Sequence, residues 1–176
     1  MPTPPLELVI FDCDGVLVDS ERISNRVLAR MLTSIGLPTT PRESMDVYMG
    51  STLAGCAELI ERNLGRPLPE HFMDDYLAAR MAALEEELVP VPGVEAALDA
   101  IAARGLATCV ASSNARRVTR ESLRIAGLLD RFGDRIFSAS EDVARGKPHP
   151  DVFLHAAAAQ GAAPAACAVV EDSPRG

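Results

Sequence analysis

The sequence contains no tryptophan, and only 4% of its 176 residues are aromatic. A core must therefore be built mainly from alanine, valine, leucine and isoleucine, which a hydrophobic content of 48% allows. None of the four cysteines belongs to a C-x-x-C pair, and no histidine lies at zinc-ligand spacing from one. The sequence therefore argues against both a zinc site and a disulfide framework.

The chain also lacks an excess of basic residues and any long apolar run. Its formal net charge of −8 argues against nucleic acid or an anionic membrane as a partner. The N-terminal stretch MPTPPLELVIFD is not a signal peptide, and no run is long enough to span a bilayer. These absences predict a cytoplasmic protein. They are compatible with an anionic substrate, because a bound cation can reverse the local charge.

A short strand followed by a long helical block is predicted for the first half of the chain. Residues 7–12, ELVIFD, form an apolar run that ends at an acid, and the turn signal CDG follows. Apolar residues then recur at helical spacing, and no strand pattern interrupts them. Thr40 and Glu43 form the signature of a capping box. The expected helices cover residues 21–35, a segment from 41, 51–64 and 70–88.

The pattern changes after VPVPG at residues 89–93. From there predicted helices alternate with predicted strands, which is typical of parallel βαβ units. The strand at 7–12 resembles the later strands and should join their sheet, so the helical block becomes an insertion. The later strands are expected at 106–112, 135–139 and 167–172, and the helices at 93–104, 115–126 and 151–160.

Chemically active side chains gather at the predicted carboxyl ends of the strands, where ligands bind in open α/β sheets. Taken singly, an aspartate after a strand is usually a turn residue, and a loop lysine is usually solvated. Taken together, four carboxylates at one sheet edge would repel each other unless a cation held them. The residues concerned are Asp12, Asp14, Ser112, Ser113, Lys147, Glu171 and Asp172.

Four stretches resemble, in order, the motifs of the haloacid dehalogenase superfamily. They are DCDGVLVDS, VASSN, the Lys-Pro segment ARGKPHPD and the acidic pair with S-x-x-G in VVEDSPRG. The similarity covers nearly the whole chain and is closest to the phosphatase and β-phosphoglucomutase-like subgroup. It implies an α/β fold with a Rossmann-like parallel sheet core, residues 1–18 and 90–176, and an inserted helical cap domain, residues 19–89.

The resemblance also implies a role for each candidate residue. Asp12 would attack phosphorus and form an aspartyl-phosphate, and Asp14 would act as general acid and then general base. Lys147 would balance the charge of the nucleophile and of the transferring group. The implied ligands of Mg²⁺ are Asp12, the backbone carbonyl of Asp14, Glu171 and Asp172. The implied phosphate-binding groups are Ser112, Ser113, Lys147 and backbone N–H groups near Gly15.

Particular residues of the sequence argue against competing functions. Mutases of this subgroup carry a histidine on the first cap helix and an arginine after the cap glycine, and ERISNRV and GSTLAG contain neither in those places. Dehalogenases lack the second acid, here Asp14. A reading from another class is a receiver domain or a non-catalytic acid-lined binding module. Receiver domains lack a helical insertion of about seventy residues after the first strand, and failure to hydrolyse any phosphate ester would favour this reading. The favoured function is therefore a Mg²⁺-dependent phosphatase acting on a small phosphorylated metabolite, with a sugar phosphate as the family-level expectation.

Three further expectations concern local positions. Ser113 and Asn114 can cap the helix that follows them. Gly50 marks either the point where the cap reaches the active site or a break between two cap helices. The chain ends immediately after the fourth motif, whereas relatives continue through a helix, a strand and a closing helix. C-terminal core elements are therefore expected to be missing, which would leave the strand at 167–172 with an open edge.

Overall fold

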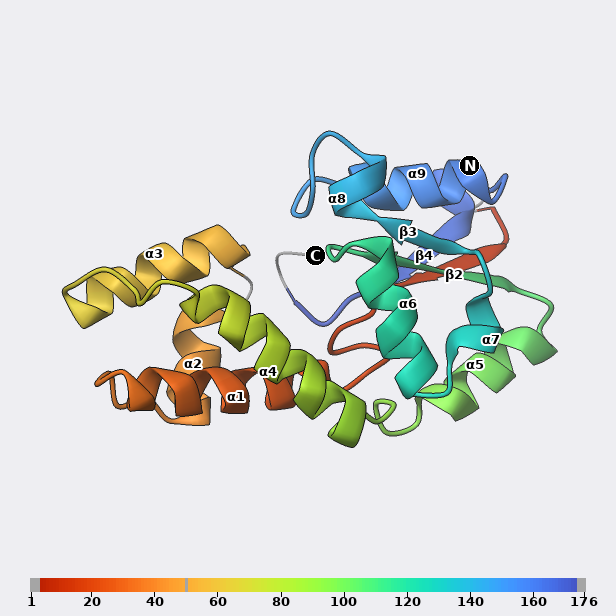
Figure 1. The fold of residues 1–176 in the computed structure, drawn as a ribbon. Coiled ribbons are helices and arrows are strands. Elements are labelled where there is room, and N and C mark those ends of the chain that lie inside the picture. The colour runs from red at the N-terminus through yellow and green to blue at the C-terminus, as the bar shows by residue number, and fades with distance from the viewer. Residues whose placement is uncertain (1–3, 50, 174–176) are drawn as a thin grey trace. The chain divides into compact units, whose positions relative to one another are not determined.

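The computed structural model describes residues 4–49 and 51–173, which form two compact units. One unit holds the sheet and combines residues up to Asp19 with those from Val89 onward; the other is Ser20–Leu88. No helix among the described residues is both long and apolar enough to cross a membrane. The elements, most of which are labelled in Figure 1, are β1 (Leu8–Phe11), α1 (Ser20–Ser34), α2 (Pro41–Tyr48), α3 (Leu53–Leu64), α4 (Phe72–Glu87), α5 (Val94–Ala103), β2 (Ala107–Ser112), α6 (Arg116–Ile125), α7 (Leu129–Phe132), β3 (Ile136–Ser138), α8 (Ala139–Asp142), α9 (Asp151–Ala159), the 3₁₀ helix η1 (Pro164–Ala166) and β4 (Cys167–Val170).

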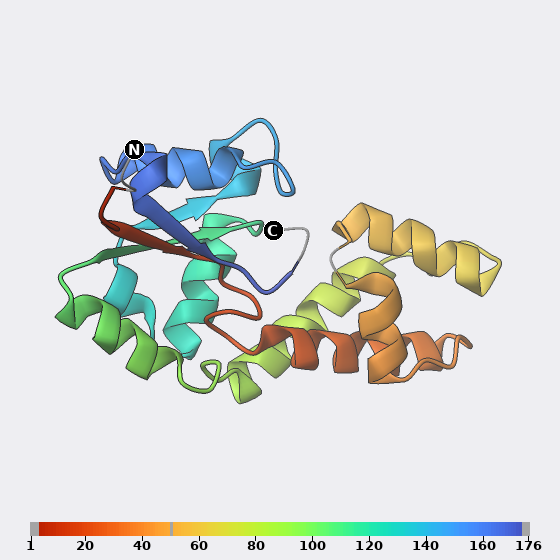
Figure 2. The same cartoon turned by 180° about the vertical axis from the view of Figure 1, so that it is seen from behind.

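In the described part of the chain, four parallel strands form the sheet in the order β3-β2-β1-β4. Helices α8 and α9 cover one face, and α5, α6 and α7 lie on the other (Figure 1, Figure 2). β1 is flanked by β2 and β4 and is buried along its whole length. That burial explains why LVIF is a continuous apolar run rather than an alternating one. The predicted α/β fold with a parallel sheet is confirmed.

Both faces of the sheet are packed with small and branched side chains. The face toward α9 joins residues of β1 and β2 with residues of that helix: Leu8, Ile10, Cys109, Ala111, Val152, Ala156 and Ala157. On the opposite face Phe11 meets the edge of the Phe132 ring, with centroids 6.3 Å apart. Each large apolar side chain buried this way contributes about 1.5–3 kcal/mol. The end of β1 therefore lies on a rigid support.

β4 lies at an edge of the sheet and ends earlier than its sequence pattern indicates. It stops at Val170, whereas the predicted strand continued to residue 172, so Glu171 and Asp172 belong to the following loop. Val169 and Val170 are 45% and 39% exposed. The pairing of β4 with β1 nevertheless fixes where that loop starts, because Phe11 pairs with Val170.

The second unit consists of four helices, and no strand occurs in its described residues 20–49 and 51–88. Its core is formed by Leu28, Leu32, Tyr48, Cys56, Ile60 and Phe72. The predicted capping box is present, because the Glu43 N–H donates to Thr40 Oγ1 and the Thr40 N–H donates to the Glu43 carboxylate. Gly50, for which two readings were open, lies outside the described residues.

The expectation that Ser113 and Asn114 cap a helix is wrong. α6 starts at Arg116, and its N-cap residue Ala115 provides no side-chain cap hydrogen bond. The Asn114 side chain is instead engaged by a residue that follows β1, as described below, and its N–H donates to Ser112 Oγ at 3.1 Å. A competing long-range hydrogen bond thus outweighs the local capping preference.

Candidate active site

Asp12 is the first acid of the site and continues the hydrogen bonding of β1 to β4. Asp12 follows Phe11 directly, and its N–H donates to the Val170 carbonyl at 2.9 Å. The residue is only 7% exposed. Because β1 is covered on both faces, the Asp12 carboxyl group is held at the carboxyl edge of the sheet with little freedom to move.

A tight turn at Gly15 separates Asp12 from the rest of its loop. Gly15 has φ of +80°, which residues with a side chain rarely adopt. A Cβ atom at this position would lie 2.2 Å from an Asp172 carboxylate oxygen, so any larger residue would have to displace that carboxylate. The Gly15 N–H donates to the Val18 carbonyl at 2.9 Å. This N–H group therefore takes part in the turn, and the phosphate contacts expected from backbone N–H groups near Gly15 stay a prediction.

The chain's single lysine lies among the acids. Lys147 Nζ donates to Asp12 Oδ1 and to Glu171 Oε2, both at 2.7 Å, and the lysine side chain is 8% exposed. The ring of Phe153 lies beneath the same ammonium, 4.8 Å from Nζ to the ring centroid, in a cation–π arrangement. Three contacts thus place one buried positive charge beside the first acid.

Three carboxylates form a group that could hold a metal ion. One oxygen each of Asp12, Glu171 and Asp172 lies within 4.8 Å of the others. Burial raises the pKa of Asp12 to about 7; Lys147 opposes this shift and the charge of Glu171 adds to it. Burial and the charge of Glu171 also raise the pKa of Asp172. A cation would relieve this repulsion, and the all-oxygen donor set fits a hard divalent ion.

Asp14 is expected to bind the metal through its backbone carbonyl, and its carboxylate has a partner outside the cluster of three acids. It accepts a hydrogen bond of 2.7 Å from Nδ2 of Asn114. Sequence reasoning missed this role of Asn114. The available signal was its place two residues after β2, the neighbour of β1, so that both loops leave the same edge of the sheet.

The two predicted phosphate-binding serines lie at the carboxyl end of β2, the strand beside β1. Ser112 closes β2 and is 1% exposed, with its Oγ accepting the Asn114 N–H. Ser113 beside it is exposed. The structure thus brings the acids, the lysine and Ser112 to one edge of the sheet, as the strand order requires.

A comparison with known families identifies the kind of protein to which this candidate active site belongs. The family model described as hydrolase, haloacid dehalogenase-like hydrolase, matches residues 6–176. The chain belongs to the haloacid dehalogenase-like hydrolases. The family predicted from the four motifs is therefore confirmed.

Two curated relatives and one solved structure illustrate the similarity of this haloacid dehalogenase-like hydrolase to known proteins. The 6-phosphogluconate phosphatase of Escherichia coli is 33% identical over 172 residues, which cover 97% of this chain and 76% of the relative. Hexitol phosphatase B of the same species is 30% identical, with coverages of 100% and 80%. A conserved haloacid dehalogenase-like protein of unknown function from Agrobacterium tumefaciens is 35% identical with a TM-score of 0.87, and the match covers 97% and 76% of the two chains. The Rossmann-like fold of this haloacid dehalogenase-like hydrolase is thus shared by a solved relative.

Proposed function

We propose that this chain is a Mg²⁺-dependent phosphatase that hydrolyses a small phosphorylated metabolite through an aspartyl-phosphate on Asp12. One observation carries the proposal. The buried Asp12 carboxyl group accepts a hydrogen bond from the Lys147 ammonium and clusters with the two further carboxylates Glu171 and Asp172. Phosphoryl transfer needs mainly positioning and neutralisation of charge, and this arrangement supplies both.

In the first half of the proposed reaction, a carboxylate oxygen of Asp12 attacks phosphorus while the bond to the ester oxygen breaks. Asp14 gives its proton to the leaving oxygen, so the alcohol departs neutral. Lys147 balances charge on Asp12 and on the transferring group. Ser112 and Ser113 are the side chains proposed to hold phosphoryl oxygens.

In the second half, the ionised Asp14 accepts a proton from a water molecule that attacks the phosphorus of the aspartyl-phosphate. The bond between phosphorus and Asp12 breaks, which restores the free carboxylate and releases inorganic phosphate. Asp14 ends protonated and is ready for the next substrate. The same side chain therefore serves as acid and as base, which requires that its position be controlled.

Asp12, Glu171 and Asp172, with the backbone carbonyl of Asp14, are the proposed ligands of Mg²⁺. When bound, the ion supplies positive charge that offsets the phosphoryl oxygens and the surrounding carboxylates. The fit rests on the oxygen-only donor set and on the raised pKa values of Asp12 and Asp172.

The proposed substrate class is supported by the names of two curated relatives. The two curated relatives are named for phosphates of a sugar acid and of sugar alcohols. We assign the same broad class, a small phosphorylated sugar derivative, to this chain. The helical unit, predicted as residues 19–89 and compact over Ser20–Leu88, is proposed to be a cap domain that selects among such substrates.

A panel of phosphorylated metabolites, scored by released phosphate in the presence of Mg²⁺, tests the proposed function. We expect at least one sugar-derived monoester to be hydrolysed far faster than the rest. Given a hexose monophosphate, the enzyme should release phosphate without forming the isomeric sugar phosphate, because the mutase-associated histidine and arginine are absent. Isomer detected by NMR before phosphate appears would instead identify a mutase. Failure on every ester would favour a non-catalytic binding module.

The pKa of Asp12 predicts how Mg²⁺ binding depends on pH. In the metal-free protein this pKa is raised to about 7, so below that pH the metal must displace a proton from Asp12. The apparent affinity should weaken about tenfold for each pH unit below the pKa and level off above it. Calorimetric titration at about pH 6 and about pH 8 measures this. Asp12→Asn should reduce the dependence, whereas equal wild-type affinity at both pH values would contradict the assignment.

A further inference from the structure

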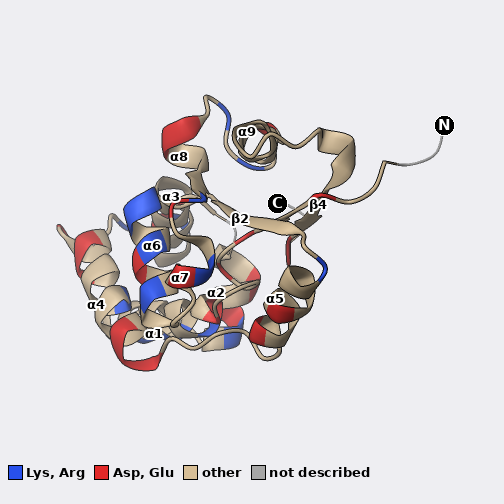
Figure 3. Cartoon of the chain, turned by 90° about the vertical axis from the view of Figure 1, so that its right-hand side faces the viewer, with Lys and Arg blue, Asp and Glu red and all other residues tan. Residues whose placement is uncertain are grey.

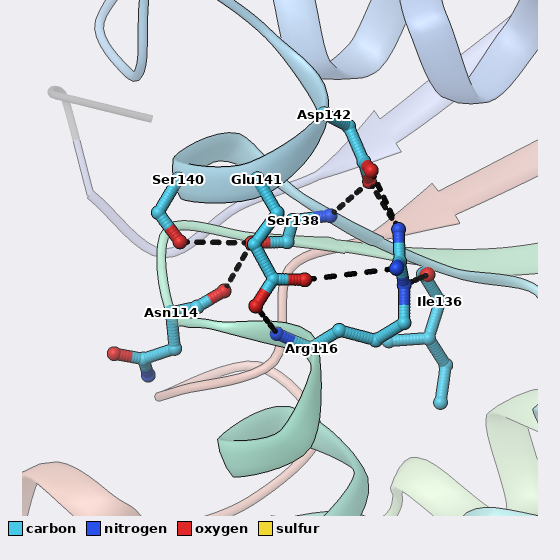
Figure 4. Close-up of polar contacts among 7 residues, drawn as sticks. All are labelled: Asn114, Arg116, Ile136, Ser138, Ser140, Glu141 and Asp142. Carbon is cyan, nitrogen blue, oxygen red and sulfur yellow. Dashed lines mark hydrogen bonds and ion pairs between the residues drawn. The ribbon is translucent and has the colours of Figure 1, made fainter.

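A chain of hydrogen bonds leads away from Asp14 to residues that the proposed reaction does not use. Asn114 Nδ2 donates to the Asp14 carboxylate at 2.7 Å. The backbone carbonyl of the same asparagine accepts a hydrogen bond of 2.8 Å from Ser138 Oγ. Ser138 is completely buried at the end of β3 and pairs in register with Ser112. The backbone of Asn114 is therefore held by Ser138 of β3, the strand next to β2 (Figure 4).

An ion pair completes this support (Figure 4). Asp142 accepts two hydrogen bonds from Arg116 Nη2, at 2.6 and 2.7 Å, and one of 2.8 Å from the Ser138 N–H. Arg116 Nε also donates to the Ile136 carbonyl at 3.0 Å. Burial works against the Asp142 charge, yet these donors hold its pKa below the usual range. We call Arg116, Asp142 and Ser138 the brace, because together they tie the start of α6 to β3 and α8.

The brace differs from the other ion pairs of α6. The helix carries four arginines, seen as blue segments in Figure 3. Arg120 pairs with Asp134, whose side chain is fully exposed, and such pairs contribute little. Asp142, by contrast, has a side chain only 14% exposed and also binds a backbone N–H group. A charge-assisted pair in this setting is well suited to fixing geometry.

We infer that the brace positions Asn114, and that Asn114 in turn orients the Asp14 carboxylate for proton transfer to and from the reacting groups. The inference rests on the proposed function of Asp14. Asp14 lies in a loop beyond β1, and its carboxylate accepts the hydrogen bond from Asn114 Nδ2 at 2.7 Å. A donor held by buried partners limits rotation of that carboxylate, and proton transfer depends steeply on such alignment. Asn114 and the brace are thus positioning residues.

Leaving-group dependence provides the test. A substrate with a poor leaving group, such as glycerol phosphate, needs the proton from Asp14, whereas dinitrophenyl phosphate releases an anion that needs none. Asn114→Ala should lower kcat/KM for glycerol phosphate about tenfold to a hundredfold, and lower kcat/KM for the dinitrophenyl ester much less. A purely structural role would lower both by the same factor, and that result would overturn the inference.

Variants of the brace should reproduce this selectivity on a smaller scale. Asp142→Asn removes the less exposed of the two carboxylates that Arg116 binds, the other being Glu141. Ser138→Ala removes the donor to the Asn114 carbonyl. Each should cost a few-fold more with glycerol phosphate than with the dinitrophenyl ester. The matched control is Asp134→Asn, the same substitution at the partner of Arg120 on the same helix. It should leave the ratio of the two rates unchanged.

A second readout keeps the inference separate from the proposed function. The chain has three asparagines, so ¹⁵N-asparagine labelling gives three side-chain amide groups, of which one belongs to Asn114. Asp14→Ala and Asp142→Asn should both shift the Asn114 amide signals, whereas Asp134→Asn should not. An inactive wild-type protein would refute the phosphatase, and the amide signals would still decide the brace. If Asp142→Asn leaves the Asn114 amide signals in place, the brace does not position Asn114.

Discussion

Asp12→Asn is expected to reduce phosphate release by about 10⁴-fold or more, for every ester that the wild-type protein hydrolyses. The substitution keeps the size of the side chain and removes the nucleophilic carboxylate. Lys147 retains its hydrogen bond to Glu171, so the surroundings of residue 12 should persist. Phosphate release measured with para-nitrophenyl phosphate and with the best substrate of the panel gives the loss directly.

The control for Asp12→Asn is the same substitution at an exposed position. Asp134→Asn neutralises a fully exposed carboxylate on the loop before β3 and should retain activity within about twofold. Both variants should unfold in a cooperative transition, which shows that the loss is chemical. Substantial turnover by pure Asp12→Asn protein would exclude Asp12 as the nucleophile.

Removal of the metal should have the second largest effect. A chelator in excess should stop turnover, and added Mg²⁺ should restore it, because ionised Asp12 and its neighbouring carboxylates need a cation to balance their charge. Asp172→Ala removes one of the three clustered carboxylates. It should raise the Mg²⁺ concentration required for half-maximal activity at least about tenfold.

The comparison for Asp172→Ala is Asp134→Ala, which should leave the Mg²⁺ requirement unchanged. Asp172 also packs against Gly15, so the variant's unfolding temperature should be recorded alongside its activity. A purely structural defect would lower activity at every Mg²⁺ concentration and would not be overcome by more metal. Full activity in excess chelator would refute the metal-dependent mechanism.

The main features of the site could be predicted from the sequence because parallel strands end at a common edge. Asp12 follows β1 and Glu171 follows β4, its direct neighbour, so their proximity depends only on strand order and length. Lys147 comes from a loop, and its place was implied by the resemblance of ARGKPHPD to a family motif. The strand boundaries differ from the prediction by a residue or two, since the pairing of the strands rather than the apolar pattern decides where a strand ends.

The direction of each side chain could not be predicted in the same way. Asn114 was expected to cap α6, yet it binds Asp14, a residue 100 positions earlier in the chain. Arg116 and Asp142 lie 26 positions apart and have no local pattern that links them. Such pairs form because packing of β2 against β1 and β3 brings three loops together. Sequence spacing specifies which residues reach an edge, whereas rotamers and neighbours specify what they contact.

The most direct test of the central claim is to trap the phosphoryl group on the protein. The enzyme is mixed with a slight excess of its best substrate, quenched in acid within the first turnover, digested and examined by mass spectrometry. We predict one added phosphoryl group on the peptide that contains Asp12, and none in Asp12→Asn protein. A phosphoryl group on another residue, or phosphate released in the first turnover without any phosphorylated peptide, would contradict the mechanism.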